Sequence, residues 1–265
     1  MRVLMCPPTH YGVYYEINAW MDVDRGVDRT EARRQWDGLY RTLTGLGVAI
    51  DRIEQIPGQP DMVFTANAGL VQDDIFVPAR FRYAERVGEE PNFTAWFYSR
   101  GYAVRPLPKH VHGAHEGEGD TLPYGELLIA GCGLRTDLPA QEAVARVLDH
   151  PMVPLRLVDP RWYHLDTCFL PLSDRLFAYV PQAFDDVARR TLEMLPGDKI
   201  VIDEADALRF AANAVVVGDD VVLPDGCPAF EDALRAHGRR PHPVPMSEFL
   251  KAGGACKCLA LVLCP

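Results

Sequence analysis

The sequence predicts an α/β fold with five-fold pseudo-symmetry, built from strand–strand–helix–strand units. Two stretches, 67–78 and 213–224, nearly superimpose: each has Asn-Ala, an apolar strand, an Asp-Asp turn and a second strand that ends in Pro. Similar units begin near Asp120, Asp166 and Cys258, and the five starting residues lie 45 to 53 residues apart. Self-similarity at a nearly fixed period is the signature of a repeat architecture. We therefore expect the residue that leads each unit to point toward a shared axis.

Length and composition favour one closed domain, predicted over 1–265. The chain is 48% hydrophobic and 24% charged, and its 22 prolines and 21 glycines are spread over turns rather than gathered in a linker. A net charge of −10 argues against a nucleic acid or an anionic membrane as partner and suits a small cationic ligand. Seven cysteines without paired spacing indicate reduced thiols and a cytoplasmic location. No stretch has the roughly 18 apolar residues of a membrane-spanning helix. For the oligomeric state, both a monomer and a homo-oligomer stay open.

The N-terminal half is expected to alternate strands with two long helices. A cap at Asp28 or Thr30 and glycines on both sides of Leu46 predict an amphipathic helix over 28–46. The stretch 9–21 is a loop rich in Tyr and Trp, either packed at the edge of the domain or closing over a substrate. The other expected elements are strands at 2–5, 48–53 and 102–106 and a helix at 91–99.

The C-terminal half is expected to continue the same pattern. The stretch 162–169 is predicted to be a strand on which His164 and Asp166, two residues apart, face the same side. Gly253-Gly254 is a flexible turn that lets the backbone approach a ligand closely, and it leads into a short apolar strand with a cysteine at its first residue. Helices are predicted at 139–150, 185–195, 229–237 and 246–251.

The polar loop 110–120 gathers histidines and acids between glycines. Its three histidines lack the spacing of a helical zinc site, and no Cys-x2-Cys pair accompanies them, so we expect no metal. Glu116, Glu118 and Asp120 are better explained as carboxylates grouped against a cation, because their mutual repulsion would otherwise raise their pKa values.

Cys258 is the candidate nucleophile. A buried structural cysteine is the alternative, but the repeat places Cys258 where Asp166 and Asn213 lead their own units. The neighbouring Lys257 can favour a thiolate. In a chain whose units converge, His164 and Asp166 are interpreted as a proton shuttle and a cation anchor rather than as structural residues.

Four motifs occur together and in order, and they cover almost the whole chain. They are Phe64-Thr65-Ala66-Asn67, Glu116-Gly117-Glu118-Gly119-Asp120, His164-Leu165-Asp166, and Gly253-Gly254 followed by Cys258. With these motifs the chain resembles the guanidine-modifying superfamily, which has a five-bladed α/β propeller called the pentein fold. Its members include arginine deiminase, dimethylarginine dimethylaminohydrolase, the amidinotransferases and arginine dihydrolase. The resemblance is greatest to arginine dihydrolase, through 5–10, 16–21, Asn67 and 163–169.

The resemblance implies a set of site residues, and the chemistry explains why they are needed. A guanidinium carbon is a poor electrophile because its charge is delocalised, so the protein must hold the cation, attack it strongly and protonate the departing amine. Cys258 would form a covalent thiouronium intermediate. His164, oriented by Glu116, would protonate the leaving ammonia and then activate water. The expected substrate-binding residues are Asn67, Asp166, Phe64, Asn18, Arg86, Arg135 and Asp61, with Arg86 and Arg135 for the α-carboxylate and Asn18 for the amino acid end.

Asn67 bears on the product, because the resembling deiminases carry Asp at this position. An amide can donate as well as accept hydrogen bonds, so it could retain a citrulline-like intermediate for a second hydrolysis. The expected reaction converts arginine to ornithine, ammonia and carbon dioxide without a cofactor. The alternatives are a single-step deiminase or dimethylarginine dimethylaminohydrolase that gives citrulline, an amidinotransferase, and a non-catalytic arginine binder. A binder would need the carboxylates but neither Cys258 nor His164.

Overall fold

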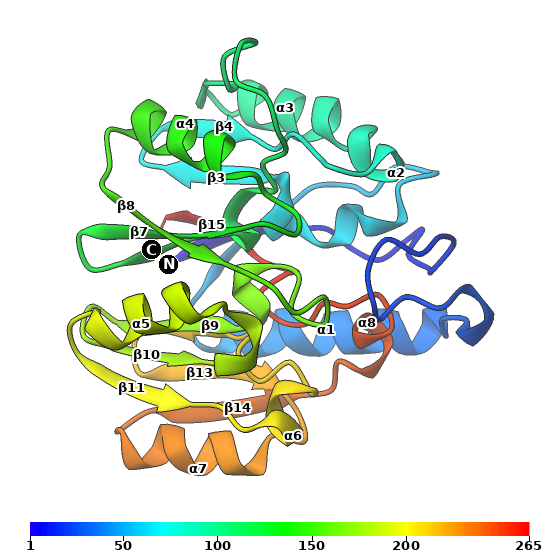
Figure 1. Cartoon of the computed structure of the whole chain (residues 1–265). Coiled ribbons are helices and arrows are strands. Elements are labelled where there is room, and N and C mark those ends of the chain that lie inside the picture. The colour runs from blue at the N-terminus through cyan, green and yellow to red at the C-terminus, as the bar shows by residue number, and fades with distance from the viewer. Residues whose placement is uncertain (265) are drawn as a thin grey trace.

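Five three-stranded sheets surround a common axis in the computed structural model, which describes residues 1–264 (Figure 1). In every sheet the first two strands pair antiparallel and the last two pair parallel. The sheets are β3–β4–β5 (Gly69–Gln72, Ile75–Pro78, Ala103–Val104), β6–β7–β8 (Thr121–Tyr124, Leu127–Cys132, Met152–Arg156), β9–β10–β11 (Phe169–Ser173, Leu176–Tyr179, Asp198–Val201), β12–β13–β14 (Val215–Val217, Asp220–Pro224, Arg240–Val244) and β15–β1–β2 (Leu261–Cys264, Arg2–Met5, Ala49–Arg52). The predicted five-fold arrangement is confirmed.

A helix joins the second strand of each sheet to the third. These helices are α1 (Arg29–Gly45), α3 (Glu90–Ser99), α4 (Leu138–Leu148), α5 (Asp186–Met194) and α7 (Pro228–Ala236), and the short helices are α2 (Ala84–Val87), α6 (Glu204–Ala207) and α8 (Ser247–Leu250). Helix α1 shows why the predicted bounds hold: the Asp28 carboxylate accepts hydrogen bonds from the first-turn amides, and Trp36, Leu39 and Leu43 bury one face.

The first strand of every sheet faces the axis. Side chains from β3, β6, β9, β12 and β15 line one cavity of about 700 Å³. Its lining is mostly apolar, but it also includes Glu118, Asp166 and Lys257. Because these polar residues lie just ahead of inner strands, the repeat delivers polar side chains to the axis. No helix within residues 1–264 is long and apolar enough to cross a membrane.

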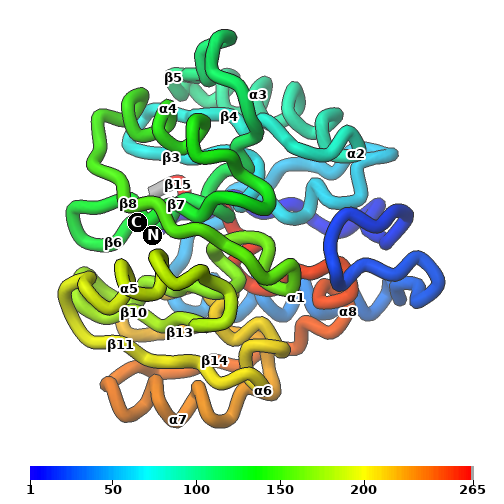
Figure 2. Tube along the Cα trace, viewed as in Figure 1, coloured from blue at the N-terminus to red at the C-terminus, as the bar shows by residue number. Residues whose placement is uncertain are grey.

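Both ends of the chain contribute to the fifth sheet. Strand β15 pairs antiparallel with β1, with Leu4 opposite Leu261, and β1 pairs parallel with β2. The marks for the N- and C-terminal ends accordingly lie side by side in Figures 1 and 2. The turn that carries Cys258 therefore leads into a strand, β15, that is held in its sheet by the N-terminal strand β1.

The prediction of a strand over 162–169 is wrong. Residues Leu165–Thr167 form a 3₁₀ turn, closed by bonds from Thr167 N to His164 O (3.2 Å) and from Cys168 N to Leu165 O (3.0 Å), and β9 begins only at Phe169. The alternation of apolar and polar residues in this stretch fits a strand, but these short-range bonds turn the backbone instead. His164 and Asp166 reach the site from this turn.

Two further strand predictions need correction. Cys258 is not the first residue of a strand, because it lies in a turn and β15 starts at Leu261. The strand predicted at 102–106 covers only Ala103–Val104. In each repeat unit the leading residue lies in a turn just before the first strand of the sheet. The backbone there does not pair with a neighbouring strand, so its side chain and the nearby amides can face the site.

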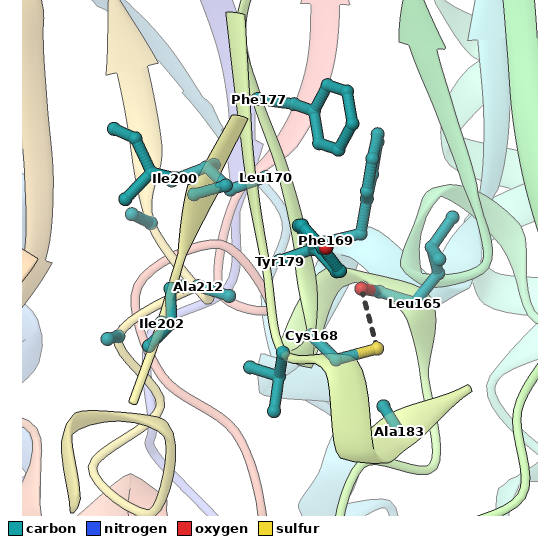
Figure 3. Close-up of a cluster of buried hydrophobic side chains, with 14 of the residues drawn as sticks. Leu165, Cys168, Phe169, Leu170, Phe177, Tyr179, Ala183, Ile200, Ile202 and Ala212 are labelled. Carbon is teal, nitrogen blue, oxygen red and sulfur yellow. Dashed lines mark hydrogen bonds between the residues drawn. The ribbon is translucent and has the colours of Figure 1, made fainter. Parts of the chain in front are cut away.

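The largest apolar cluster anchors the turn that carries His164 and Asp166. Figure 3 shows Leu165 and Cys168 among the buried side chains of this cluster, together with Phe169, Phe177 and Tyr179. The Cys168 thiol also donates to the backbone oxygen of Leu165 at 3.5 Å. Packing on the core side thus fixes the turn while its polar side chains face the site.

Candidate active site

The leading residues of the third, fourth and fifth units meet around the Cys258 thiol. Cys258 Sγ donates to Asp166 Oδ2 at 3.3 Å and accepts from Asn213 Nδ2 at 3.1 Å. The side chain of Cys258 is buried, and burial followed by the Asp166 charge raises its pKa well above the usual value. In the substrate-free site the sulfur therefore rests as a thiol, and it needs a nearby positive charge to ionise.

His164 lies in a buried group of acids from the second unit. Its Nε2 is 2.8 Å from Glu116 Oε2 and 3.9 Å from Asp120 Oδ2, and its Nδ1 is 3.5 Å from Asn67 Nδ2. A carboxylate beside Nε2 and an amide donor beside Nδ1 together assign the proton to Nε2 in the neutral ring. His164 can then take a proton at Nδ1.

Glu116 is held as a carboxylate. Burial alone raises the pKa of Glu116, but the Arg135 charge and the His164 hydrogen bond outweigh it, so the pKa lies well below the ordinary value. Arg135 Nη1 donates to Glu116 Oε2 at 2.8 Å. Burial raises the pKa of the neighbouring Asp120 to about 6, while His164 lowers it. The predicted pairing of His164 with Glu116 is thus present in the geometry.

Two aspartates present carboxylate oxygens that have no partner. Asp61 and Asp166 are 2% and 1% exposed, and Oδ1 of each is buried without a hydrogen-bond partner. Burial raises the pKa of Asp61, and it raises the pKa of Asp166 to about 7, although Lys257 lowers the latter. Buried carboxylate oxygens without donors are costly, and a guanidinium would satisfy them by planar, charge-assisted hydrogen bonds.

Both predicted arginines are buried and already engaged by carboxylates. Arg86 donates to both oxygens of Glu89 and, through Nη1, to Asn67 Oδ1 at 2.9 Å. Arg135 bonds Glu116 and the Ile17 carbonyl, and its guanidinium stacks on two tyrosine rings. Neither arginine is a surface charge. Their binding of a substrate α-carboxylate stays a prediction.

Phe64 and Asn18 border the Gly253-Gly254 turn. An added Cβ at Gly254 would lie 2.5 Å from the Phe64 ring, and one at Gly253 would lie 3.0 Å from Asn18 Oδ1. Asn18 donates to the Ala252 carbonyl at 3.0 Å, so the aromatic loop 9–21 packs against this turn. Gly253 also has φ of +81°, which a residue with a side chain rarely adopts. A role for Asn18 at the amino acid end stays a prediction.

The remaining residues of the polar loop do not act as a group. His115 is fully buried, whereas His110 and His112 are exposed. Glu118 pairs with Lys257 at 2.7 Å and accepts from Val262 N, so the Lys257 ammonium is bound to a carboxylate. Within residues 1–264 no cluster of His, Cys, Asp and Glu side chains is placed to hold a metal ion.

Sequence reasoning missed Asn213 and Glu89. Asn213 contacts the Cys258 thiol, and the repeat had already marked it as the leader of the fourth unit without giving it a role. Glu89 binds Arg86, which in turn binds Asn67. The one sequence signal for the Arg86–Glu89 pair is its three-residue spacing on a helical turn.

Known proteins are similar to this chain over almost its whole length. No protein-family model matches the sequence. The chain is 47% identical to the N(G),N(G)-dimethylarginine dimethylaminohydrolase of Mycobacterium tuberculosis, over 100% of this chain and 86% of that protein. It is 44% identical to the bifunctional arginine dihydrolase/ornithine cyclodeaminase ArgZ of Synechocystis, over 98% of this chain and 37% of that protein. It therefore spans little more than a third of the bifunctional relative.

Solved structures share the fold closely. The N-terminal domain of ArgZ, covalently bonded to a reaction intermediate, has a TM-score of 0.95 at 42% identity and covers 99% of this chain and 97% of its own. AgrE with L-arginine has a TM-score of 0.95 at 44% identity, over 100% of this chain and 40% of that one. The chain therefore belongs to the guanidine-modifying superfamily with the pentein fold, in the family of cysteine-dependent hydrolases that includes dimethylarginine dimethylaminohydrolase and arginine dihydrolase.

Proposed function

We propose that the protein hydrolyses arginine to ornithine, two molecules of ammonia and carbon dioxide, through covalent intermediates on Cys258. The observation that carries this proposal is the Cys258 thiol, 3.3 Å from Asp166, a buried carboxylate whose other oxygen has no partner. A guanidinium held by that oxygen would lie beside the sulfur. No step of the reaction requires a cofactor, because all the chemistry is nucleophilic attack and proton transfer.

Substrate binding itself activates the nucleophile. The guanidinium brings a positive charge against Asp166 and Asp61, which offsets the carboxylate charge that raises the pKa of Cys258. As the cation enters, the thiol proton passes to Nδ1 of His164, and the thiolate forms beside its target carbon. Without a bound cation only a small fraction of the thiol is ionised, so the free enzyme reacts slowly with alkylating agents and oxidants.

The first hydrolysis proceeds in two halves. Thiolate attack on the guanidinium carbon forms the C–S bond, and His164 supplies a proton to the departing ammonia, leaving a thiouronium. His164 then takes a proton from water, which attacks the same carbon, and the C–S bond breaks to give citrulline and free Cys258. Glu116, 2.8 Å from Nε2, stabilises the protonated ring during both transfers.

The second hydrolysis depends on retaining the ureido group. The Nδ2 group of Asn67 faces His164 Nδ1 at 3.5 Å and the Glu116 backbone oxygen at 3.4 Å. Both contacts are long, so Nδ2 can donate instead to a ureido oxygen bound in this region. A donor there stabilises the oxyanion formed when Cys258 attacks a second time. Loss of the second ammonia leaves a thiocarbamate on Cys258. Water then attacks its carbon, and the C–S bond breaks to free Cys258 and a carbamate of ornithine, which releases carbon dioxide.

The experiment is a product balance. Purified protein is incubated with arginine, and ornithine, citrulline and ammonia are measured over the time course. Two ammonia and one ornithine per arginine are expected, with citrulline absent or transient. Stoichiometric accumulation of citrulline with one ammonia would replace the two-step reaction with a deiminase reaction.

Hydrolysis of dimethylarginine to citrulline is the second candidate. It is favoured by the relative from Mycobacterium tuberculosis, 47% identical over 86% of that protein's length. The same assay with dimethylarginine separates the two: release of dimethylamine from dimethylarginine, with arginine untouched, would assign the methylated substrate. Arginine comes first as substrate because the Asn67 amide suits a neutral ureido intermediate as well as a cation.

A further inference from the structure

Asn213 is a fully buried amide whose four hydrogen bonds all involve the nucleophile or its surroundings. Oδ1 accepts from the backbone N–H of Ala255 (3.0 Å) and of Cys258 (3.2 Å). Nδ2 donates to the backbone oxygen of Asp166 (3.0 Å) and to Cys258 Sγ (3.1 Å). One side chain thus links the turn that carries the nucleophile to the turn that carries the cation anchor.

The partners fix which way the amide points. Backbone N–H groups can only donate and the Asp166 carbonyl can only accept, so the oxygen must face Ala255 and Cys258 N while the NH2 faces Asp166 O and the sulfur. A fixed N–H aimed at sulfur is worth more to a thiolate than to a thiol, because hydrogen bonds to a charged acceptor are the stronger ones.

We propose that Asn213 is a positioning residue that fixes the Cys258 turn and donates a hydrogen bond to the thiolate during the reaction. It acts through Cys258 and touches no substrate atom. The inference rests on the proposed function in one respect only, namely that Cys258 is the nucleophile. It explains why the fourth repeat unit, which supplies no acid or base to the chemistry, has a polar leading residue beside the Cys258 thiol.

The two roles of the amide can be separated. Asn213→Asp keeps an oxygen toward both backbone N–H groups but replaces the NH2 with a second oxygen, which repels a thiolate. Asn213→Ser removes most of the contacts without adding charge. Asn92→Asp is the matched control: it makes the same exchange on α3, where the amide bonds only the Gly88 carbonyl.

The test is the pH dependence of Cys258 alkylation by iodoacetamide in substrate-free protein, followed by peptide mass mapping. We expect Asn213→Asp to move the profile upward by at least about one pH unit, which slows alkylation about tenfold at a fixed pH below the transition. Asn213→Ser should move it upward less, and Asn92→Asp should follow wild type. The arginine kcat should fall in both Asn213 variants with KM changed much less.

Unchanged alkylation profiles in both Asn213 variants would overturn the proposal. A loss of kcat without any shift of the alkylation profile would also overturn it, because Asn213 would then support folding and not the thiolate. Melting temperatures identify misfolding, and Asn213→Ser keeps the test open if Asn213→Asp does not fold. Alkylation needs no substrate, so this result stands even if the product balance shows that arginine is not the substrate.

Discussion

Arg86 Nη1 donates a 2.9 Å hydrogen bond to Asn67 Oδ1, and this contact orients the Asn67 amide toward His164 and Glu116. With its oxygen engaged, the amide points Nδ2 at Nδ1 of His164 (3.5 Å) and at the Glu116 carbonyl (3.4 Å). Glu89, fully buried, holds Arg86 from the other side through two bonds. A buried ion pair therefore decides that position 67 presents a donor.

Asn67→Asp should shift the product from ornithine toward free citrulline, with ammonia falling from two to about one per arginine. The new carboxylate can still accept from Arg86 and from a guanidinium, but it offers no N–H to a ureido oxygen, so citrulline leaves before a second attack. A charged hydrogen bond contributes about 1.5–3 kcal/mol, enough to change this partition. Mass spectrometry with an ammonia assay measures the ratio, and Asn92→Asp should leave it unchanged.

Cys258→Ser should abolish turnover while arginine still binds, because Asp61 and Asp166 remain and only nucleophilicity is lost. Cys256→Ala is the matched control: this thiol is also buried and lies in the same apolar cluster, but the contacts with Asp166 and Asn213 belong to Cys258. It should keep activity with a modest loss of stability. Calorimetric titration with arginine and a turnover assay check both variants. An active Cys258→Ser protein would remove Cys258 from the reaction.

Asp166→Asn should stabilise the protein at high pH and not at low pH. Burial raises the pKa of Asp166 from 3.8 to about 7, so the folded state holds a proton that the unfolded chain releases. This titration of Asp166 destabilises the folded state. The effect is absent below the pKa that Asp166 has in the unfolded chain, and it grows until the pH passes the pKa that Asp166 has in the folded protein. The gain in melting temperature should therefore be largest above pH 7 and vanish near pH 4. A gain that does not change with pH would contradict the shift.

The same titration predicts how arginine affinity depends on pH in the wild-type protein. A neutral Asp166 cannot pair with a cation, so Kd for arginine should rise as the pH falls below about 7. Binding measured on Cys258→Ser, which cannot turn over, isolates this effect from chemistry. Affinity that is flat between pH 8 and pH 5 would show that Asp166 does not hold the guanidinium.

Gly254→Ala should lower kcat/KM by at least about tenfold, the order expected for a small displacement of site groups. Its Cβ would lie 2.5 Å from the Phe64 ring and 3.2 Å from Cys258 Cβ, and Phe64 packs edge-on against Tyr11 and Phe249. Gly38→Ala is the control, because nothing lies within 4 Å of its Cβ in the middle of α1. It should stabilise the protein by about 1 kcal/mol and leave activity unchanged. Equal activity in both variants would mean that the Phe64 ring moves aside for the added methyl group without disturbing the site.

The repeat made the fold predictable, because two nearly superimposable hairpins and regular spacing define five units without any tertiary information. Helix bounds followed from local signals such as the Asp28 cap, which the structure reproduces. The turn at Leu165–Thr167 could not be predicted in this way. An apolar–polar alternation fits both a strand and a turn whose apolar residues enter the core, and only the packing of Leu165 and Cys168 decides between them.

The predicted site residues come from four units. The structure joins His164 to Glu116 and Asn67, and Cys258 to Asp166, as the regular spacing of the units could suggest. Their hydrogen-bond partners could not be inferred. That Arg86 is engaged by Glu89 depends on the rotamers of side chains within one turn, and that Lys257 bonds Glu118 depends on residues far apart in the sequence. Such choices follow from burial, since a buried charge must find a partner wherever the fold provides one.

The pairing of β15 with β1 has a consequence for the order in which the protein matures during translation. Strand β1 is made before the other described strands and has no antiparallel partner until residues near Leu261 are made. The four other sheets contain only residues made earlier and can form in sequence. Cys258 is made almost together with β15, which completes the fifth sheet, so a nascent chain can assemble the carboxylates of Asp61 and Asp166 long before it carries the Cys258 thiol.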